Sequence, residues 1–208
     1  HDACRKICIL ASIAFGRHVY PRQVPTEGIS GVTLADVAYA ASCGRKIKLL
    51  GRAVKEDDGR VCAYVAPHLV DGEAPLAGVE DVFNAIVVKG DAIGDAMFYG
   101  RGAGKLPAAS AVVADVMDAA RHIRSRKRIE WGPGGEDVAV GPESVPFRWY
   151  VRALGTAEAA RAVPGASLLT RPDAPDGEAA FLTGPMTRAQ LEEVCAGLGL
   201  QSVFRVLE

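Results

Sequence analysis

Asp2 and Lys6 are the residues of this chain whose types and spacing most directly suggest chemistry. They are four residues apart in a segment with helical periodicity, so their side chains are expected on one helix face, about one turn apart. An ammonium group can donate a proton to a developing oxyanion while a neighbouring carboxylate binds an amine or a hydroxyl. The same spacing also describes an ordinary exposed helix pair, worth about 0.3–0.5 kcal/mol. Spacing alone does not choose between these two interpretations.

A second candidate is the glycine-rich sequence from Gly100 to Lys105. It is not a P-loop, because that motif requires Ser or Thr after the lysine, where this chain has Leu106. The segment follows a predicted strand and opens a predicted helix, so its backbone could approach a ligand closely and the helix dipole could favour an anion. The alternative is a tight turn between a strand and a helix.

The elements that would position these residues can be read from apolar periodicity and turn residues. A helix is expected from Asp2, as N-cap, to Gly16, and a second from Thr33 to Ser42. Strand-like runs and a long helix, which starts near Pro107, follow in the order 46–55, 60–67, 83–89, 92–99 and 107–124. This order predicts an α+β fold with a mixed or antiparallel sheet covered by helices, rather than repeated βαβ units.

The composition changes at residues 126–145, a Gly/Pro-rich segment that we interpret as a linker. Beyond it, the predicted strands and helices follow a βαββαβ order, a ferredoxin-like arrangement. The predicted organisation is therefore one domain over residues 1–125, a linker over 126–145 and a small domain over 146–208.

Composition excludes several classes of protein. The chain has 208 residues, 49% of them hydrophobic, with 24 Lys and Arg against 25 Asp and Glu. This balance argues against a nucleic-acid binder, and no apolar run approaches the roughly 20 residues of a membrane span.

Five scattered cysteines suit buried thiols in a cytoplasmic protein, and the four histidines show no ligand spacing, so no metal site is predicted. The basic run at 121–128 is interpreted as a solvated helix end.

Several blocks of sequence together carry a family resemblance. Residues 1–120 resemble the catalytic, substrate-binding half of homoserine dehydrogenase. The matching blocks are 2–11 (DACRKICILA), 27–29 (EGI), 32–37 (VTLADV), 46–50 (KIKLL), 75–79 (PLAGV), 84–86 (NAI), 98–104 (FYGRGAG) and 107–112 (PAASAV). By its order of elements and its position, the region 146–208 resembles the ACT domain that follows the catalytic part in many members of this family.

The resemblance implies an activity and a role for each candidate residue. Members of this family reduce L-aspartate 4-semialdehyde to L-homoserine with NADPH or NADH, in the synthesis of threonine, methionine and isoleucine. By motif match, Lys6 would be the proton donor to the aldehyde oxygen and Asp2 would bind the amino end of the substrate. Gly102, Ala103 and Gly104 would correspond to the turn beside the nicotinamide, where the absence of bulky side chains permits close approach.

The family pattern also implies partners outside this sequence. The Rossmann domain that carries the GxGxxG fingerprint precedes the Asp2 position in the family, so we expect the isolated chain to be inactive without it. A homodimer through the catalytic-domain sheet is expected. An alternative is a regulatory module that senses an amino-acid effector through the ACT-like domain, and a purely structural role is a third possibility.

Overall fold

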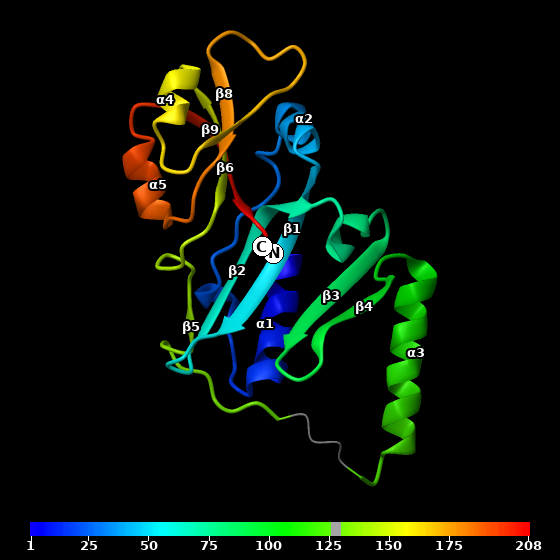
Figure 1. The fold of residues 1–208 in the computed structure, drawn as a ribbon. Helices are drawn as coiled ribbons and strands as arrows, with labels where there is room; N and C mark the ends of the chain where they lie inside the picture. The colour runs from blue at the N-terminus through cyan, green and yellow to red at the C-terminus, as the bar shows by residue number, and fades with distance from the viewer. Residues whose placement is uncertain (126–129) are drawn as a thin grey trace. The chain divides into compact units, whose positions relative to one another are not determined.

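The computed structural model describes residues 1–125 and 130–208, and it is an α+β structure with a mixed sheet, as predicted (Figure 1). Its longer elements are α1 (Asp2–Phe15), α2 (Leu34–Ser42), β1 (Arg45–Lys55), β2 (Val61–Asp71), β3 (Phe83–Gly90), β4 (Gly94–Arg101), α3 (Lys105–Arg121), β5 (Ala139–Val140), β6 (Trp149–Leu154), α4 (Ala157–Arg161), β7 (Ser167–Leu169), β8 (Glu178–Leu182), α5 (Arg188–Val194) and β9 (Gly199–Val206). Short 3₁₀ turns lie at Pro21–Gln23 and Pro75–Gly78. None of the helices described has the length and apolar character needed to cross a bilayer.

Contacts divide the chain into two compact units. The first combines His1–Gly72 with Glu130–Glu208, and the second is Glu73–Ile129, which is described up to residue 125. The domain boundaries predicted from the sequence, at 125 and 146, remain a prediction. Four residues of the predicted linker, 126–129, lie outside the described residues, as does the end of the basic run. The linker prediction did not include β5, which forms within it.

In the described part of the first unit, seven strands form one sheet in the order β1-β2-β9-β6-β8-β7, with β5 also paired to β2. Both β5 and β9 run parallel to β2, and the other neighbours are antiparallel. The parallel contact pairs His68 with Arg205 and Leu69 with Val206. Strands from the two ends of the chain therefore share one hydrogen-bonded sheet.

The second unit contains a separate two-stranded sheet. Here β3 and β4 pair antiparallel from Phe83 opposite Arg101 to Gly90 opposite Gly94. The expectation that the strands between residues 46 and 99 form one sheet is therefore wrong. Alternating apolar residues predicted each strand, but they carry no signal for which strands pair.

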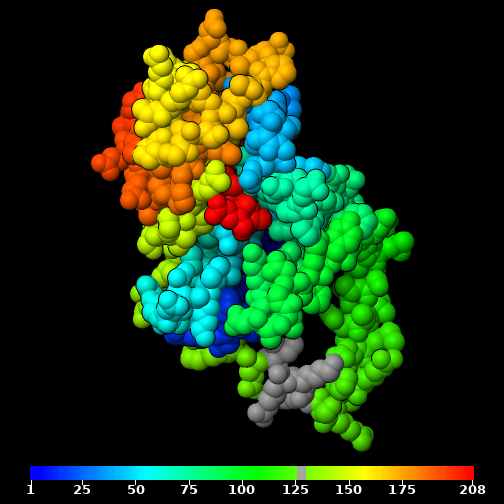
Figure 2. Space-filling view, viewed as in Figure 1, coloured from blue at the N-terminus to red at the C-terminus, as the bar shows by residue number. Residues whose placement is uncertain are grey.

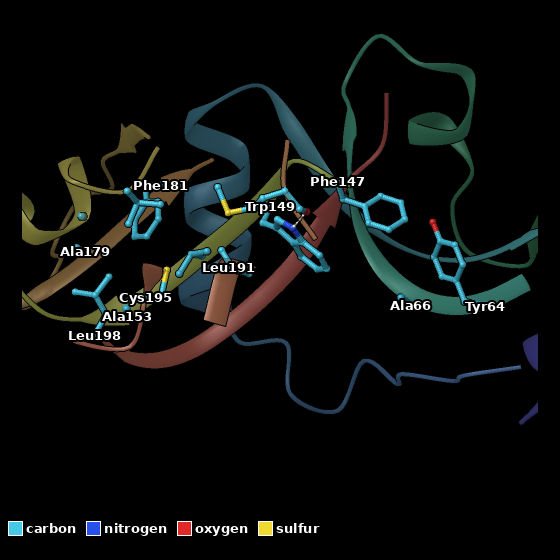
Figure 3. Close-up of a cluster of buried hydrophobic side chains, with 14 of the residues drawn as sticks. Tyr64, Ala66, Phe147, Trp149, Ala153, Ala179, Phe181, Leu191, Cys195 and Leu198 are labelled. Atoms are coloured by element: carbon cyan, nitrogen blue, oxygen red, sulfur yellow. Dashed lines mark hydrogen bonds between the residues drawn. The ribbon is translucent and has the colours of Figure 1, made fainter. Parts of the chain in front are cut away.

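The C-terminal region has the predicted βαββαβ order, and its strands are arranged as β9-β6-β8-β7. On one face of these strands, α4 and α5 close an apolar cluster that includes Trp149, Phe181 and Leu191 (Figure 3). On the other face, Tyr39 and Ala40 of α2 pack in a second cluster. Helix α2 itself lies beside the C-terminal region in both overall views (Figures 1 and 2). A helix from the N-terminal half therefore covers the sheet face that α4 and α5 leave open.

A buried ion pair holds α2 on this face. Asp36, with no exposed surface, accepts hydrogen bonds from Arg152 Nε at 2.7 Å, Tyr150 Oη at 3.0 Å and Ser202 Oγ at 3.0 Å. It also accepts from the backbone and hydroxyl of Thr33, the helix N-cap. Burial alone would raise the pKa of Asp36, but the bonds from Arg152 and Thr33 outweigh it and lower the pKa. The buried carboxylate is therefore charged and fully paired.

Strand β2 also buries a histidine. His68 has no exposed surface, and its Nδ1 lies 2.9 Å from the carbonyl oxygen of Ala66. Burial, together with repulsion from Arg52 and Arg205, lowers the pKa of His68 to about 4 despite the contact with Ala66. His68 is therefore neutral at pH 7.

We predict that Asp36→Asn lowers the free energy of unfolding by about 3 kcal/mol, because it removes the more deeply buried of the two carboxylates that pair with Arg152, the other being Glu178. Urea unfolding measures this change. The matched control is Glu192→Gln on α5, which removes an exposed pair with Arg188 and should cost at most about 1 kcal/mol. Equal costs for the two variants would contradict the role of the buried pair.

We also predict that acid destabilises the protein through His68. Its pKa is lower in the folded state than in the unfolded chain, so its contribution is complete at neutral pH and is lost as the pH falls from about 6.5 to about 4, by up to about 3 kcal/mol. Unfolding measured across this range should show a flatter pH dependence for His68→Gln. The same slope in His68→Gln and in the wild type would contradict this role of His68.

Candidate functional site

The first candidate residues, Asp2 and Lys6, lie on α1, and the buried face of this helix determines which of its side chains point outward. Cys4, Cys8 and Ala11 recur at helical spacing and pack in an apolar cluster with residues of β2. The helix ends at Gly16, which has a φ of 69° in the left-handed region, as predicted. Asp2 was expected to be the N-cap, but His1 occupies that position and Asp2 is the first helical residue. A carboxylate in the first turn is stabilised by the helix dipole.

The position of α1 on the sheet depends on a close contact with β1. A Cβ atom at Gly51 would lie only 3.0 Å from Cβ of Ile7. The C-terminal end of the helix is held by Ser12, whose hydroxyl donates to the carbonyl of Cys8 at 2.7 Å and accepts from Val19 N at 3.0 Å. The middle of α1 therefore lies close to β1, and its C-terminal part is bound to the segment that follows the helix.

The structure brings Asp2 and Lys6 together on the face of α1 that points away from this cluster. Lys6 Nζ lies 2.8 Å from Asp2 Oδ2, and the two side chains are 59% and 81% exposed, respectively. The hydrogen bond from Lys6 is the largest cause that lowers the pKa of Asp2. The pair thus presents one ammonium and one ionised carboxylate to the surroundings, within reach of the same small molecule.

The glycine-rich turn lies in the second compact unit, between β4 and α3. A Cβ atom at Gly102 would collide with the side-chain amide of Asn84, so this position tolerates only glycine without a local shift. Gly104 has a φ of 113°, a conformation that favours glycine, and it is the N-cap of α3. Because Gly104 has no side chain, it cannot cap the helix, and the first-turn N–H groups of this 17-residue helix receive no hydrogen bond to an N-cap side chain. Ala103 is exposed between the two glycines.

These features determine which groups the chain could bind. An exposed turn with little side-chain bulk, leading into an uncapped helix, fits the close approach of a flat ring and of a negatively charged group. Among the described residues, no three His, Cys, Asp or Glu side chains are gathered to hold a metal ion. Asp2 and Lys6 belong to the first compact unit and the glycine-rich turn belongs to the second.

Sequence reasoning missed Gly51 as part of the support for this site. The signal was an isolated glycine inside a strand-like run, which often marks a close approach by another part of the chain. The sequence did not show which part would approach, because Ile7 is far away along the chain.

Comparison with known proteins places these residues in a family. The family profile described as "Homoserine dehydrogenase" matches residues 1–117. The homoserine dehydrogenase of Mycobacterium leprae is 48% identical over 159 residues, which cover 73% of this chain and 35% of the relative. The enzyme of the same name from Pseudomonas aeruginosa is 46% identical over 124 residues, which cover 60% of this chain and 28% of the relative. Asp2 and Lys6 lie inside the segment matched by the profile.

Solved structures extend the similarity over the whole chain. A homoserine dehydrogenase from Thiobacillus denitrificans has a TM-score of 0.79 at 29% identity, and one from S. aureus, solved at pH 6.0, has a TM-score of 0.75 at 30% identity. Each match covers 100% of this chain and 53% of the solved one, so the chain spans about half the length of these relatives. From the profile match and these similarities, the chain belongs to the homoserine dehydrogenase family.

Proposed function

We propose that this chain forms the substrate-binding part of a homoserine dehydrogenase that reduces L-aspartate 4-semialdehyde to L-homoserine with NADPH or NADH. The observation that carries the proposal is the exposed Asp2–Lys6 pair, at 2.8 Å, on a helix inside the segment that matches the family. Its place would be in the synthesis of threonine, methionine and isoleucine, in the cytoplasm.

In this proposal Lys6 is the general acid. When bound, the nicotinamide supplies the hydride to the aldehyde carbon, and negative charge then develops on the carbonyl oxygen. The Lys6 ammonium donates a hydrogen bond to that oxygen and then transfers its proton, giving the hydroxyl of homoserine. The exposed position of Lys6 makes its Nζ atom accessible to a substrate. The bond to Asp2 occupies one of the three N–H donors of Lys6, so the others can bind the substrate oxygen.

Asp2 is the proposed substrate-binding group. Its lowered pKa keeps the carboxylate ionised at neutral pH, so that it can accept hydrogen bonds from the substrate's ammonium group. The same carboxylate orients Lys6 through their direct bond. Asp2 and Lys6 would therefore bind opposite ends of one short substrate.

The turn of Gly102, Ala103 and Gly104 is the proposed contact with the nicotinamide part of NADP or NAD. The conformation of Gly104 and the uncapped start of α3 support this assignment, because both leave the backbone open to a ligand. The proposal assigns the remainder of cofactor binding to a Rossmann domain of the complete enzyme.

We propose a homodimer that forms through the two-stranded sheet of the second unit. Apolar side chains remain exposed along its strands, and exposed apolar patches commonly mark protein interfaces. Ile86, Val88 and Phe98 share one face of this sheet, because Ile86 is opposite Phe98 and Val88 is opposite Ala96.

An amino-acid effector bound by an ACT-like domain at 146–208 is the second candidate function. The βαββαβ order of this region favours it. The sheet face beneath α2 is unsuited to an effector, because Asp36 and Arg152 are paired with each other there. An effector would therefore have to bind at an edge of this sheet or on the side of α4 and α5.

We predict that Lys6→Ala lowers kcat of the complete enzyme at least about 100-fold, the usual contribution of a general acid. Lys6→Arg should also be slow, because a guanidinium keeps the charge but does not release a proton. Arg5→Ala, which removes the neighbouring exposed cation, is the control and should keep wild-type kcat. Near-normal turnover by Lys6→Ala, measured as NADPH oxidation with aspartate semialdehyde, would refute the assignment.

Calorimetric titration with L-threonine tests the second candidate. If the C-terminal region binds an effector, the protein should show saturable heat that Asp2→Asn leaves unchanged, because Asp2 lies on α1 and outside that region. No heat over millimolar concentrations would remove threonine as the effector.

A further inference from the structure

The contact between β1 and α1 gives Gly51 a role beyond folding. Gly51 lies on β1, and a Cβ atom there would stand 3.0 Å from Cβ of Ile7 and 3.4 and 3.5 Å from its Cγ1 and Cγ2. Contact at 3.0 Å is closer than side-chain carbons normally pack, so even one methyl group would have to push the helix or the Ile7 side chain away. The missing side chain of Gly51 therefore sets how closely α1 approaches the sheet.

Ile7 is adjacent to Lys6, so what moves Ile7 also moves the candidate site. In an α-helix the backbone moves as a hydrogen-bonded unit, and displacement of one turn carries its neighbours with it. The flexible stem of Lys6 does not remove this dependence, since Nζ is bound to Asp2, which moves with the same helix. A shift of α1 thus moves both candidate groups together relative to any substrate or cofactor bound by other parts of the enzyme.

The rest of the α1 contact leaves little room to absorb such a shift. The helix presents the small residues Cys4, Cys8 and Ala11 to Ala63 of β2 and to neighbouring strand residues, all in one buried cluster. At its far end, Ser12 is bound to both Cys8 and Val19. Pressure at Gly51 would therefore act on the turn of α1 that carries Ile7 and Lys6.

We propose that Gly51 is a positioning residue for the reaction: by lacking a side chain under Ile7, it sets the position of Lys6 and Asp2. This inference rests on the proposed function of these two residues. Misplacement of a catalytic group by about 1 Å can cost about 100-fold in rate. The inference makes a graded prediction for side chains of increasing size at position 51.

The test measures kcat and kcat/KM of Gly51→Ala and Gly51→Val in the complete enzyme, per folded molecule. We expect a loss of about 3-fold for Ala, to which Ile7 must yield by a few tenths of an ångström, and of about 100-fold for the larger Val. Val has a high strand propensity, so instability of β1 is not the expected cause. Adding Ile7→Gly to each variant removes the Cβ, Cγ1 and Cγ2 atoms that the new side chain meets. It should restore much of kcat/KM relative to the Ile7→Gly single variant, which a general loss of stability would not allow.

Gly197→Ala is the matched control, because a Cβ atom there meets nothing within 4 Å, and it should behave as wild type. Wild-type kcat/KM in Gly51→Val, or a loss that Ile7→Gly does not relieve, would overturn the inference. The proposed function would still stand if Lys6→Ala is inactive. Full activity of Lys6→Ala would overturn both. If the Val variants do not fold, Gly51→Ala measured with and without Ile7→Gly decides by the same criteria.

Discussion

The burial of β2 on both faces is the constraint on which the rest of the structure depends. Ten of its eleven residues, from Val61 to Val70, are buried. One face holds α1 through Val61, Ala63 and Val65, and the other contributes Tyr64 and Ala66 to the cluster of the C-terminal region. Strands β1, β5 and β9 all pair with it. The candidate catalytic helix and the C-terminal region are therefore attached to the same central strand.

Buried charge adds specificity to this apolar arrangement. Asp36, Arg152, Glu178 and Arg171 form a chain of ion pairs between α2 and the C-terminal strands. Such pairs often add little net stability relative to apolar packing, but leaving one charge unpaired is costly. They therefore favour one seating of α2 on the sheet over others. Since α2 leads directly into β1, the same seating fixes the strand that supports α1.

Local signals predicted the local structure of this chain well. Apolar periodicity that ends at Gly16 predicted α1, the capping residue Thr33 predicted the start of α2, and the C-terminal βαββαβ order is observed. The sequence did not reveal contacts between distant segments, such as the parallel pairing of His68 with Arg205. It also did not show that β3 and β4 form their own sheet, because a period of two identifies a strand but not its partner.

The same limit applies to the candidate site. The spacing of Asp2 and Lys6 predicted that they share a face, and the structure places them in contact. Their chemical roles came from the resemblance to a family, since the same spacing also suits a simple surface pair. Only the structure shows that the position of the Asp2–Lys6 pair depends on Gly51, because the contact joins Gly51 on β1 to Ile7 on α1.

The most direct test of the central claim is a crystal structure of the complete enzyme with homoserine and an oxidised nicotinamide cofactor bound. The account predicts that Lys6 Nζ lies within hydrogen-bond distance of the homoserine hydroxyl, about 2.6–3.2 Å, with the substrate's ammonium group on Asp2. A homoserine hydroxyl bonded to another group, with Lys6 and Asp2 paired only with each other in solvent, would contradict it.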